Sequence, residues 1–216
     1  MPTEPRDLCI VLVAAGSSTR MGFPKLWAPV GGTPLVARAL AAAEAAQPGE
    51  LVLVVGQERL DEAQAFASPH VKVVPGGARR RDSVTAGLSV TSATWVAIHD
   101  AARALVPTDM FERGLIAAQA TGAAIPGLPL KDTIKRVSDS RVVGTPPRAE
   151  HVAVQTPQVF RRDLLERALG LTDEDVTDEA ALLERLGVAV AVFQGDERAF
   201  KVTTPLDFAL VRALLG

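Results

Sequence analysis

Residues 8–25 read LCIVLVAAGSSTRMGFPK, an apolar run followed by a loop of small residues and two cations. The run Leu8–Val13 has the composition of a buried parallel strand, which is covered on both faces and therefore need not alternate with polar residues. The small residues after it allow backbone N–H groups to approach a phosphate or a base, and Arg20 and Lys25 add positive charge. The stretch predicts a nucleoside triphosphate site, with a flexible surface loop as the alternative.

Apolar runs alternate with helical patterns through most of the chain. The expected strands after the first are 51–55, 71–74 and 95–99, and the expected helices are 34–46, 59–66, 82–89 and 109–118. This alternation predicts right-handed parallel crossovers, and hence an α/β fold with a Rossmann-like, mostly parallel sheet flanked by helices. Because ligands of such sheets bind beyond the carboxyl ends of the strands, the loops that begin at Ala14, Pro75 and Asp100 are expected to converge on one cleft.

Capping residues mark the start of two helices. Thr33 is the expected N-cap of the helix over 34–46, with Pro34 at its first position. Thr204 plays the same part before the last helix, with Pro205 and Asp207 in its first turn. Between these helices, the pattern of apolar residues in the last third of the chain predicts two further helices, over 162–169 and 178–186, and a strand over 188–193.

Residues 131–145 interrupt the α/β pattern. Polar and apolar residues alternate there around Ser138-Asp139-Ser140, which predicts a β-hairpin arm. An isolated hairpin is marginally stable in water, so the arm should pack either on a dimer partner or on its own domain. We expect a single domain over residues 1–216, with the arm inserted at about 131–148.

Composition narrows the class of protein. The net charge of −2 argues against nonspecific nucleic-acid binding, and a hydrophobic content of 48% suffices for a packed core. The single cysteine, Cys9, lies within the first apolar run, so it is expected to be a buried core thiol. No apolar run reaches the length of a membrane span and nothing resembles a signal peptide, so we expect a cytoplasmic protein without a membrane partner.

The first loop resembles the signature of sugar-nucleotide-type nucleotidyltransferases. It has neither the Gly-x-Gly-x-x-Gly spacing of dinucleotide folds nor the Gly-Lys-Ser/Thr ending of a P-loop. It has instead Ala-Ala-Gly at 14–16, Arg-Met at 20–21 and Pro-Lys at 24–25. Members of that superfamily activate a phosphate or an alcohol with a nucleoside triphosphate and release pyrophosphate.

Further motifs follow in order along the chain. They are GGARRRDSV at 76–84, HDAAR at 99–103, KDTIK at 131–135, QTPQVF at 155–160, TDEA at 177–180 and KVT at 201–203. With the first loop, they resemble the 2-C-methyl-D-erythritol 4-phosphate cytidylyltransferase family from about Leu8 to Leu215. The resemblance implies a homodimeric enzyme that joins CTP and methylerythritol phosphate, with release of pyrophosphate, in non-mevalonate isoprenoid precursor synthesis.

The resemblance also implies a nucleotide site. Arg20 and Lys25 match the catalytic cations that stabilise the triphosphate, and Mg²⁺ would bridge phosphate oxygens. Arg80 is expected to fix the glycine loop, although the arginines at 79–81 could also form a solvated face. Ser83 is expected to read cytosine, or else to be an ordinary first-turn helix residue. The residues that match nucleotide contacts are Ala14, Ala15, Gly16, Ser17, Gly77, Arg80 and Ser83.

The acceptor side is implied in the same way. Asp100 is the expected carboxylate for Mg²⁺ or for a substrate hydroxyl, with a turn cap as the alternative, whereas His99 is expected to be structural. Thr133 and Arg148 match positions that reach the neighbouring subunit's site from the arm, so the dimer would exchange arms. Thr177 and Lys201 could also be an N-cap and a surface charge. The residues that match acceptor contacts are Asp100, Ala101, Arg103, Thr133, Arg148, Thr156, Thr177 and Lys201.

Three positions depart from the family pattern and put the local loop geometry in doubt. Leu26 stands where the family commonly has Gln, Ala104 where it usually has Pro, and Ala199 where it often has Asn. Enzymes that transfer a cytidylyl or guanylyl group to molybdopterin, or a cytidylyl group to ribitol phosphate, remain alternatives. A nucleotide-binding regulatory module without catalysis is a further one, which the retained cations and Asp100 disfavour.

Overall fold

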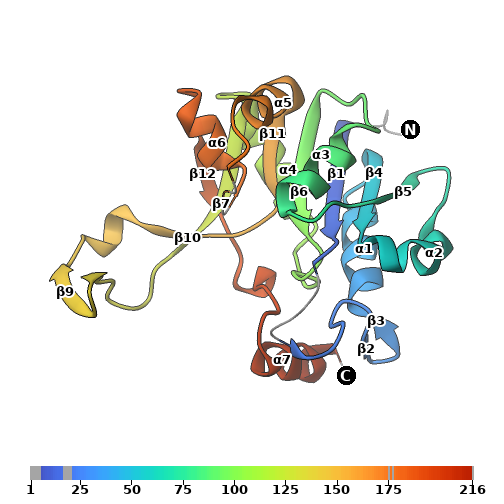
Figure 1. Ribbon diagram of the computed structural model, residues 1–216, viewed down its shortest axis with the longest axis horizontal. Coiled ribbons are helices and arrows are strands. Elements are labelled where there is room, and N and C mark those ends of the chain that lie inside the picture. Colours follow the sequence, from blue (N-terminus) through green and yellow to red (C-terminus); the bar gives the residue numbers. More distant parts are fainter. Residues whose placement is uncertain (1–5, 17–20, 175, 177, 216) are drawn as a thin grey trace.

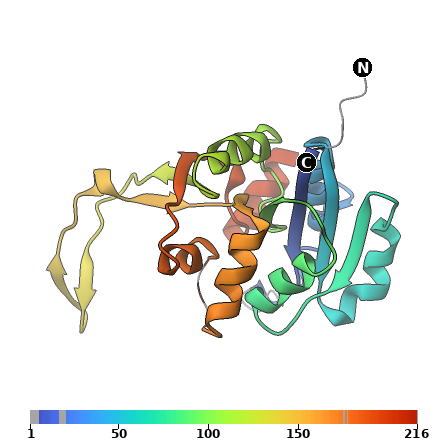
Figure 2. The same cartoon turned by 90° about the horizontal axis from the view of Figure 1, so that it is seen from above.

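The computed structural model describes residues 6–16, 21–174, 176 and 178–215. A central sheet lies between two layers of helices, and a thin arm projects from one side of the body (Figures 1 and 2). The eight-stranded sheet has the order β10-β7-β11-β6-β1-β4-β5, with β12 also paired to β7. Its strands are β1 (Arg6–Ala14), β4 (Pro48–Val55), β5 (Val71–Pro75), β6 (Trp95–Asp100), β7 (Ala123–Pro129), β10 (Val152–Val154), β11 (Gln158–Arg161) and β12 (Ala191–Gln194).

The strands that were expected to be parallel are parallel. β1 pairs with β4 on one side and with β6 on the other, and β4 pairs with β5. This confirms a mostly parallel α/β sheet. The sequence patterns did not predict β7, β10 or β11, and β11 lies antiparallel between β6 and β7. Its direction follows from the arm, because the chain leaves the carboxyl end of β7 and returns to the same edge of the sheet before β11 begins.

Each face of the sheet is covered by its own hydrophobic core. One core includes side chains of α1 (Leu35–Ala45), α4 (Asp109–Gln119) and α7 (Pro205–Leu215). The other includes side chains of α3 (Arg80–Leu88), α5 (Arg162–Leu171) and α6 (Ala180–Arg185). Alternate residues of β1 enter the two cores, so its apolar run serves both faces, as its composition predicted. Cys9 lies in the second core, where burial raises the pKa of its thiol to about 11.

Two local expectations need correction. Thr33 does not cap the first helix: it lies in a two-residue ladder between β2 (Pro29–Val30) and β3 (Thr33–Pro34), and none of the described side chains caps α1. The helix expected over 59–66 is broken into α2 (Leu60–Ala63) between two 3₁₀ turns. The last helix agrees with its prediction, because the Asp207 N–H donates to Thr204 Oγ1 at 3.2 Å and Asp207 Oδ2 accepts from the Thr204 N–H at 2.7 Å.

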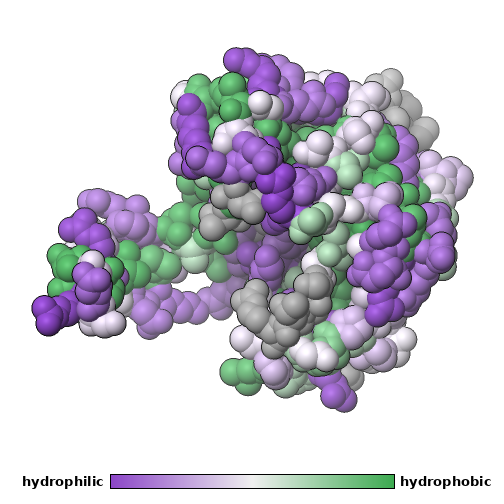
Figure 3. Space-filling view, viewed as in Figure 1, coloured by the Kyte–Doolittle hydropathy of each residue, from purple (hydrophilic) through white to green (hydrophobic). Residues whose placement is uncertain are grey.

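The arm is a β-hairpin, as its alternation predicted. β8 (Arg136–Ser138) pairs antiparallel with β9 (Arg141–Gly144). The turn between them places Asp139 and Ser140 at positive φ, 49° and 60°, which matches the twist of a short hairpin. Val137, Val142 and Val143 are exposed on the arm and form a hydrophobic patch that is visible in Figure 3. None of the helices in the described part of the chain is long and apolar enough to cross a membrane.

Candidate active site

A cavity of about 300 Å³ opens where the loops after β1, β5 and β6 meet. Its lining includes Gly16 and Lys25 of the first loop, Gly77 of the second and Asp100 at the end of β6. Lys201 reaches the same cavity from the segment after β12. The predicted convergence of the three loops is therefore confirmed, and a fourth segment adds Lys201 to it.

The glycine loop is closely packed against the start of α3. A Cβ added to Gly76 would lie 2.6 Å from Ser83 Oγ and 2.7 Å from Ala15 Cβ, and one added to Gly77 would lie 2.3 Å from Asp82 Cβ. Larger residues would therefore push the loop away from both β1 and α3. The Gly77 N–H donates to Ser83 Oγ at 3.2 Å. Ser83 thus holds the loop, and its contact with a cytosine base stays a prediction.

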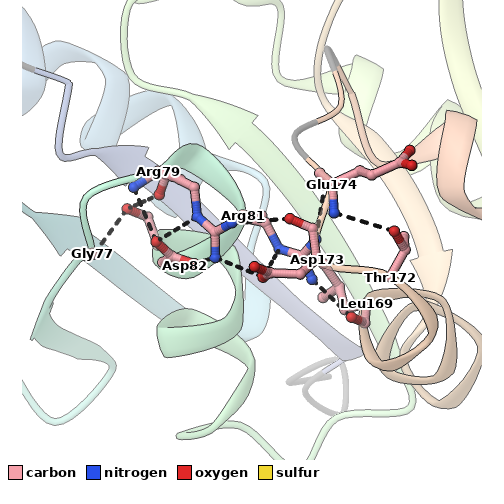
Figure 4. A network of polar contacts seen from close by, with 9 residues as sticks. Gly77, Arg79, Arg81, Asp82, Leu169, Thr172, Asp173 and Glu174 are labelled. Atoms are coloured by element: carbon pink, nitrogen blue, oxygen red, sulfur yellow. Dashed lines mark hydrogen bonds and ion pairs between the residues drawn. The ribbon is translucent and has the colours of Figure 1, made fainter.

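The arginines at 79–81 are not a solvated face. Arg79 donates to Asp82 at the helix start and, at 2.8 Å, to Asp173 Oδ1 beyond the end of α5 (Figure 4). Arg81 is buried and donates to the carbonyl oxygens of Leu169 and Glu174 at 2.8 and 2.9 Å. These contacts tie the start of α3, beside the glycine loop, to the segment after α5.

Arg80 points to a different set of partners. Its guanidinium contacts Asp100 Oδ1 at 3.2 Å and donates to Glu179 Oε1. The expectation that Arg80 fixes the glycine loop is therefore wrong, because the partners of Arg80 lie elsewhere and the Gly77 N–H bonds to Ser83 instead. Arg80 still lines the cavity, so a contact between it and the nucleotide remains a prediction.

Asp100 lies between cations at the end of β6. Oδ1 faces Arg80, and Oδ2 accepts from Lys201 Nζ at 2.7 Å. Burial alone would raise the pKa of this carboxyl group, but Arg80 and Lys201 outweigh burial and hold the pKa well below its usual range. Asp100 is therefore ionised and oriented at both oxygens, rather than being a turn cap.

Glu179 is a residue of the site for which the sequence motifs predicted no role. Its side chain is buried just before α6, with Oε1 bound to Arg80 and Oε2 without a hydrogen-bond partner among the described residues. Burial raises the pKa of Glu179, and Arg80 opposes that shift. The TDEA motif contained this residue, but only the fold reveals that it lies against Arg80.

Thr156 is held beneath Asp100. Its hydroxyl oxygen accepts from the Asp100 N–H at 3.1 Å and lies 3.0 Å from His99 Nδ1. His99 is fully buried, and burial lowers its pKa to about 4, so the ring is neutral and Nδ1 can accept the Thr156 hydroxyl proton. His99 is therefore structural, as expected, and the Thr156 hydroxyl has two protein partners.

The other acceptor-side residues divide into two groups. Arg103 is held near the cleft by a 2.7 Å bond to the Ala199 carbonyl, and the Ala101 N–H donates to Val13 O. Thr133 and Arg148 are exposed on the arm and do not line the cavity of their own chain. Three predicted site residues lie outside the described residues: Ser17, Arg20 and Thr177. Of the remaining first-loop residues, Ala15 lines the cavity, whereas Ala14 is buried at the end of β1.

The described carboxylates offer no ready metal cage. No group of three or more His, Cys, Asp or Glu side chains comes together in residues 6–16, 21–174, 176 and 178–215. Both oxygens of Asp100 already face cations, so a metal ion at Asp100 would have to share or displace one of them. The expectation that Asp100 is a metal ligand stays a prediction.

The chain is similar to one family over nearly its whole length. Residues 8–216 match the family model described as IspD: 2-C-methyl-D-erythritol 4-phosphate cytidylyltransferase. A curated relative of that name from Rhodococcus opacus (strain B4) is 43% identical over 98% of this chain and 97% of its own length. Another from Nocardia farcinica (strain IFM 10152) is 46% identical and covers 94% and 91%.

Solved structures agree with these relatives. The 2-C-methyl-D-erythritol 4-phosphate cytidylyltransferase of Thermus thermophilus superposes with a TM-score of 0.79 at 34% identity, covering 95% of this chain and 97% of its own. The 4-diphosphocytidyl-2C-methyl-D-erythritol synthase of Anaerococcus prevotii gives 0.86 at 25% identity, covering 97% and 98%.

Proposed function

The chain belongs to the 2-C-methyl-D-erythritol 4-phosphate cytidylyltransferase family, and we propose that its cleft transfers the cytidylyl group of CTP to 2-C-methyl-D-erythritol 4-phosphate. The observation that carries this proposal is the pairing of two half-sites in one cavity. The close-packed glycine loop and Lys25 form one half, and Asp100 with Lys201 forms the other. One half suits a nucleotide and the other suits a phosphorylated polyol.

The nucleotide half uses backbone groups and cations. Ala15, Gly16 and Gly77 have little or no side chain to obstruct a base or a phosphate. Lys25 lines the same cavity and would stabilise charge that grows on the α-phosphoryl oxygens during transfer. Arg20, which belongs to the same motif, is proposed to act with Lys25.

The acceptor half needs no nucleophilic side chain of the protein. A phosphate monoester is already ionised near neutral pH, so one of its oxygens can attack the α-phosphorus of CTP directly. The bond from the α-phosphorus to the bridging oxygen of the β-phosphate breaks, and pyrophosphate leaves with that electron pair. Lys201 and Arg103 would hold the acceptor phosphate, and ionised Asp100 would accept hydrogen bonds from its hydroxyl groups.

A divalent cation is part of the proposal. Mg²⁺ would neutralise charge on the phosphate oxygens of CTP, with most of its ligands from the triphosphate and water. This fits a cleft whose described carboxylates are committed to cations.

The arm is proposed to complete the site of a second subunit. Thr133 and Arg148 lie outside the lining of their own cavity, and the exposed valines of the arm need a cover. Arg148 is held in place by a 2.5 Å bond from Nη1 to the Lys131 carbonyl. A homodimer with exchanged arms would bury the valines and bring Arg148 to the partner's acceptor phosphate.

A substrate panel tests the assignment. Pyrophosphate release is measured with CTP and Mg²⁺ in the presence of methylerythritol phosphate, ribitol phosphate or molybdopterin, and again with the divalent cation chelated. We expect metal-dependent release with methylerythritol phosphate. Equal or faster release with either other acceptor would overturn the substrate, and CTP binding without release for any acceptor would indicate a binding module.

A further inference from the structure

The turn at residues 155–158, which joins β10 to β11, contacts three segments around the acceptor half of the cleft. Gln155, Thr156 and Gln158 are all buried, with exposed fractions of 5%, 4% and 1%. Buried polar side chains need partners, and each of these has at least one on a segment that is distant in sequence, although Gln158 Oε1 has none among the described residues. Thr156 supports Asp100, as described above, and the two glutamines support the segments on either side.

Gln155 makes the most complete of these contacts. Its side-chain carbonyl accepts from the Asp196 N–H at 3.1 Å, and its side-chain amide donates to the Asp196 carbonyl at 2.9 Å. The side chain therefore binds both backbone groups of Asp196, as a neighbouring strand would. The fit is close, because a Cβ added to Gly195 would lie 2.5 Å from Gln155 Oε1.

The segment that begins at Asp196 contains the groups that position the two cations of the acceptor half, Arg103 and Lys201. Three residues beyond Asp196, the Ala199 carbonyl accepts from Arg103 Nη1 at 2.7 Å. Two residues further on, Lys201 reaches Asp100. The Ala199 N–H returns to the Asp196 carbonyl at 3.0 Å, so a shift of Asp196 moves the turn on which both contacts depend.

Gln158 makes a looser contact on the other side. Its amide lies 3.5 Å from Asp178 Oδ2, and Asp178 Oδ1 accepts from the Ala181 N–H at 3.1 Å at the start of α6. The residue after Asp178, Glu179, holds Arg80. The turn therefore faces the supports of Lys201, Asp100 and Arg80. Of its two glutamines, Gln155 has two well-formed bonds, whereas the contacts of Gln158 are long.

We propose that Gln155 is a positioning residue for the acceptor phosphate, acting through Asp196 and Ala199 on Lys201 and Arg103. It touches neither substrate nor reacting atoms. This inference rests on the proposed function, in which Lys201 and Arg103 bind the phosphate group of the acceptor. Its effect falls on acceptor binding, and CTP binding, which uses the other half of the cleft, is left unchanged.

The test compares kinetic constants for the two substrates. In Gln155→Ala we expect the KM for methylerythritol phosphate to rise about tenfold or more, since two part-buried hydrogen bonds to the backbone of Asp196 are lost. The KM for CTP should stay within about twofold. Inorganic phosphate, used as an inhibitor that competes with the acceptor, should lose affinity in parallel. Gln194→Ala, a change of an exposed glutamine two residues before Asp196, is the matched control and should behave as wild type.

A second variant reaches the same contact from the other side. Gly195→Ala keeps Gln155 but crowds its amide oxygen, so it should give the same split between the two KM values. The double variant should be no worse than Gln155→Ala alone, because both changes break one contact. Gln155→Glu retains the acceptor for the Asp196 N–H but replaces the donor to the Asp196 carbonyl by a carboxylate oxygen, so it should not restore acceptor binding.

The outcomes separate this inference from the proposed function. A wild-type protein without turnover on methylerythritol phosphate would overturn the proposed function itself. An active wild type in which Gln155→Ala and Gly195→Ala raise both KM values equally, or act additively, would overturn the positioning role alone. Unchanged KM values in both variants would do the same.

Discussion

Asp100 is the residue on which the two sides of the cleft meet. A buried carboxylate is costly unless it is paired, and here Arg80 and Lys201 each take one oxygen. The family resemblance of their motifs predicted Asp100, Lys201 and Arg103 as one site. It could not predict the link from Asp100 through Arg80 to Glu179, because residues 80 and 179 are 99 positions apart and no local pattern relates them.

Lys25 can be tested directly. Lys25→Ala should lower kcat by about two to three orders of magnitude, because it removes a charge that stabilises the transition state. Steady-state kinetics with CTP and methylerythritol phosphate measures the effect. Lys72→Ala is the control, since Lys72 is an exposed lysine that pairs with Glu50 on β4. Near-normal turnover of Lys25→Ala would contradict a catalytic role.

His99 should make the folded state sensitive to acid. Burial lowers its pKa from the usual 6.5 to about 4, so the folded protein binds fewer protons there than the unfolded chain. Its contribution to stability is therefore fully present above about pH 6.5 and is lost as the pH falls toward 4. At about 1.4 kcal/mol per pKa unit, the loss amounts to about 3 kcal/mol.

A neutral variant isolates this contribution. Urea unfolding of wild type and His99→Gln at about pH 7.5 and about pH 4.5 should show a smaller fall in stability for the variant, by about 2 to 3 kcal/mol. His70→Gln, at an exposed histidine, should fall as wild type does. Parallel falls in wild type and His99→Gln would show that His99 does not titrate as described.

At the scale of elements, the start of α3 organises the nucleotide half. Gly76 and Gly77 lie against it, Arg79 and Asp82 close its first turn, and Arg81 anchors it to the end of α5. The motif at 76–84 predicted a glycine turn before a helix. It left open whether the arginines were solvated, because the carbonyl groups that Arg81 binds come from residues 169 and 174.

Two contacts at the start of α3, those of Arg81 and Asp173, should contribute differently to the free energy of unfolding. Arg81→Met should lower the free energy of unfolding by about 2 to 3 kcal/mol, because it leaves carbonyl groups without their donors in a buried setting. Asp173→Ala should cost no more than about 0.5 kcal/mol, since the Asp173 side chain is 84% exposed. Urea unfolding measures both.

The control for Arg81 is an arginine with an exposed partner. Arg161→Met removes a surface pair with Asp163 and should cost little. A loss for Arg81→Met as small as that of Arg161→Met would show that the carbonyl contacts do not stabilise α3.

At the scale of the whole molecule, the arm is a part that the single chain leaves uncovered. It extends away from the body, carries exposed valines and presents Arg148 outside its own cavity's lining (Figures 1 and 3). Its alternating pattern predicted a hairpin, and the hairpin is present. The proposed exchange of arms in a dimer predicts that the arm of one subunit completes the site of the other, and this can be tested.

Mixing two inactive variants tests that exchange. Arg148→Ala damages the arm and Lys25→Ala damages the body, so in a mixed dimer one site would combine an intact body with an intact arm. Co-expression in equal amounts should restore about a quarter of wild-type activity if dimers form at random. Lys25→Ala mixed with Lys201→Ala, two body variants, is the control and should restore none. No recovery in the first mixture would mean that Arg148 does not act across the dimer.

The sequence by itself determined the order of strands β1, β4, β5 and β6 and of the loops after them, the family, and the kinds of side chain proposed to meet the substrates, because periodicity and motif spacing are local properties. The convergence of the loops after β1, β5 and β6 on one cleft was predictable, because parallel strands end at the same edge of a sheet. Only the tertiary structure decided which partners hold those side chains: Glu179 on Arg80, Thr156 under Asp100 and Gln155 on Asp196. Such contacts join distant segments through packing, so the apolar run and small-residue loop of residues 8–25 could predict a triphosphate site but not the supports around it.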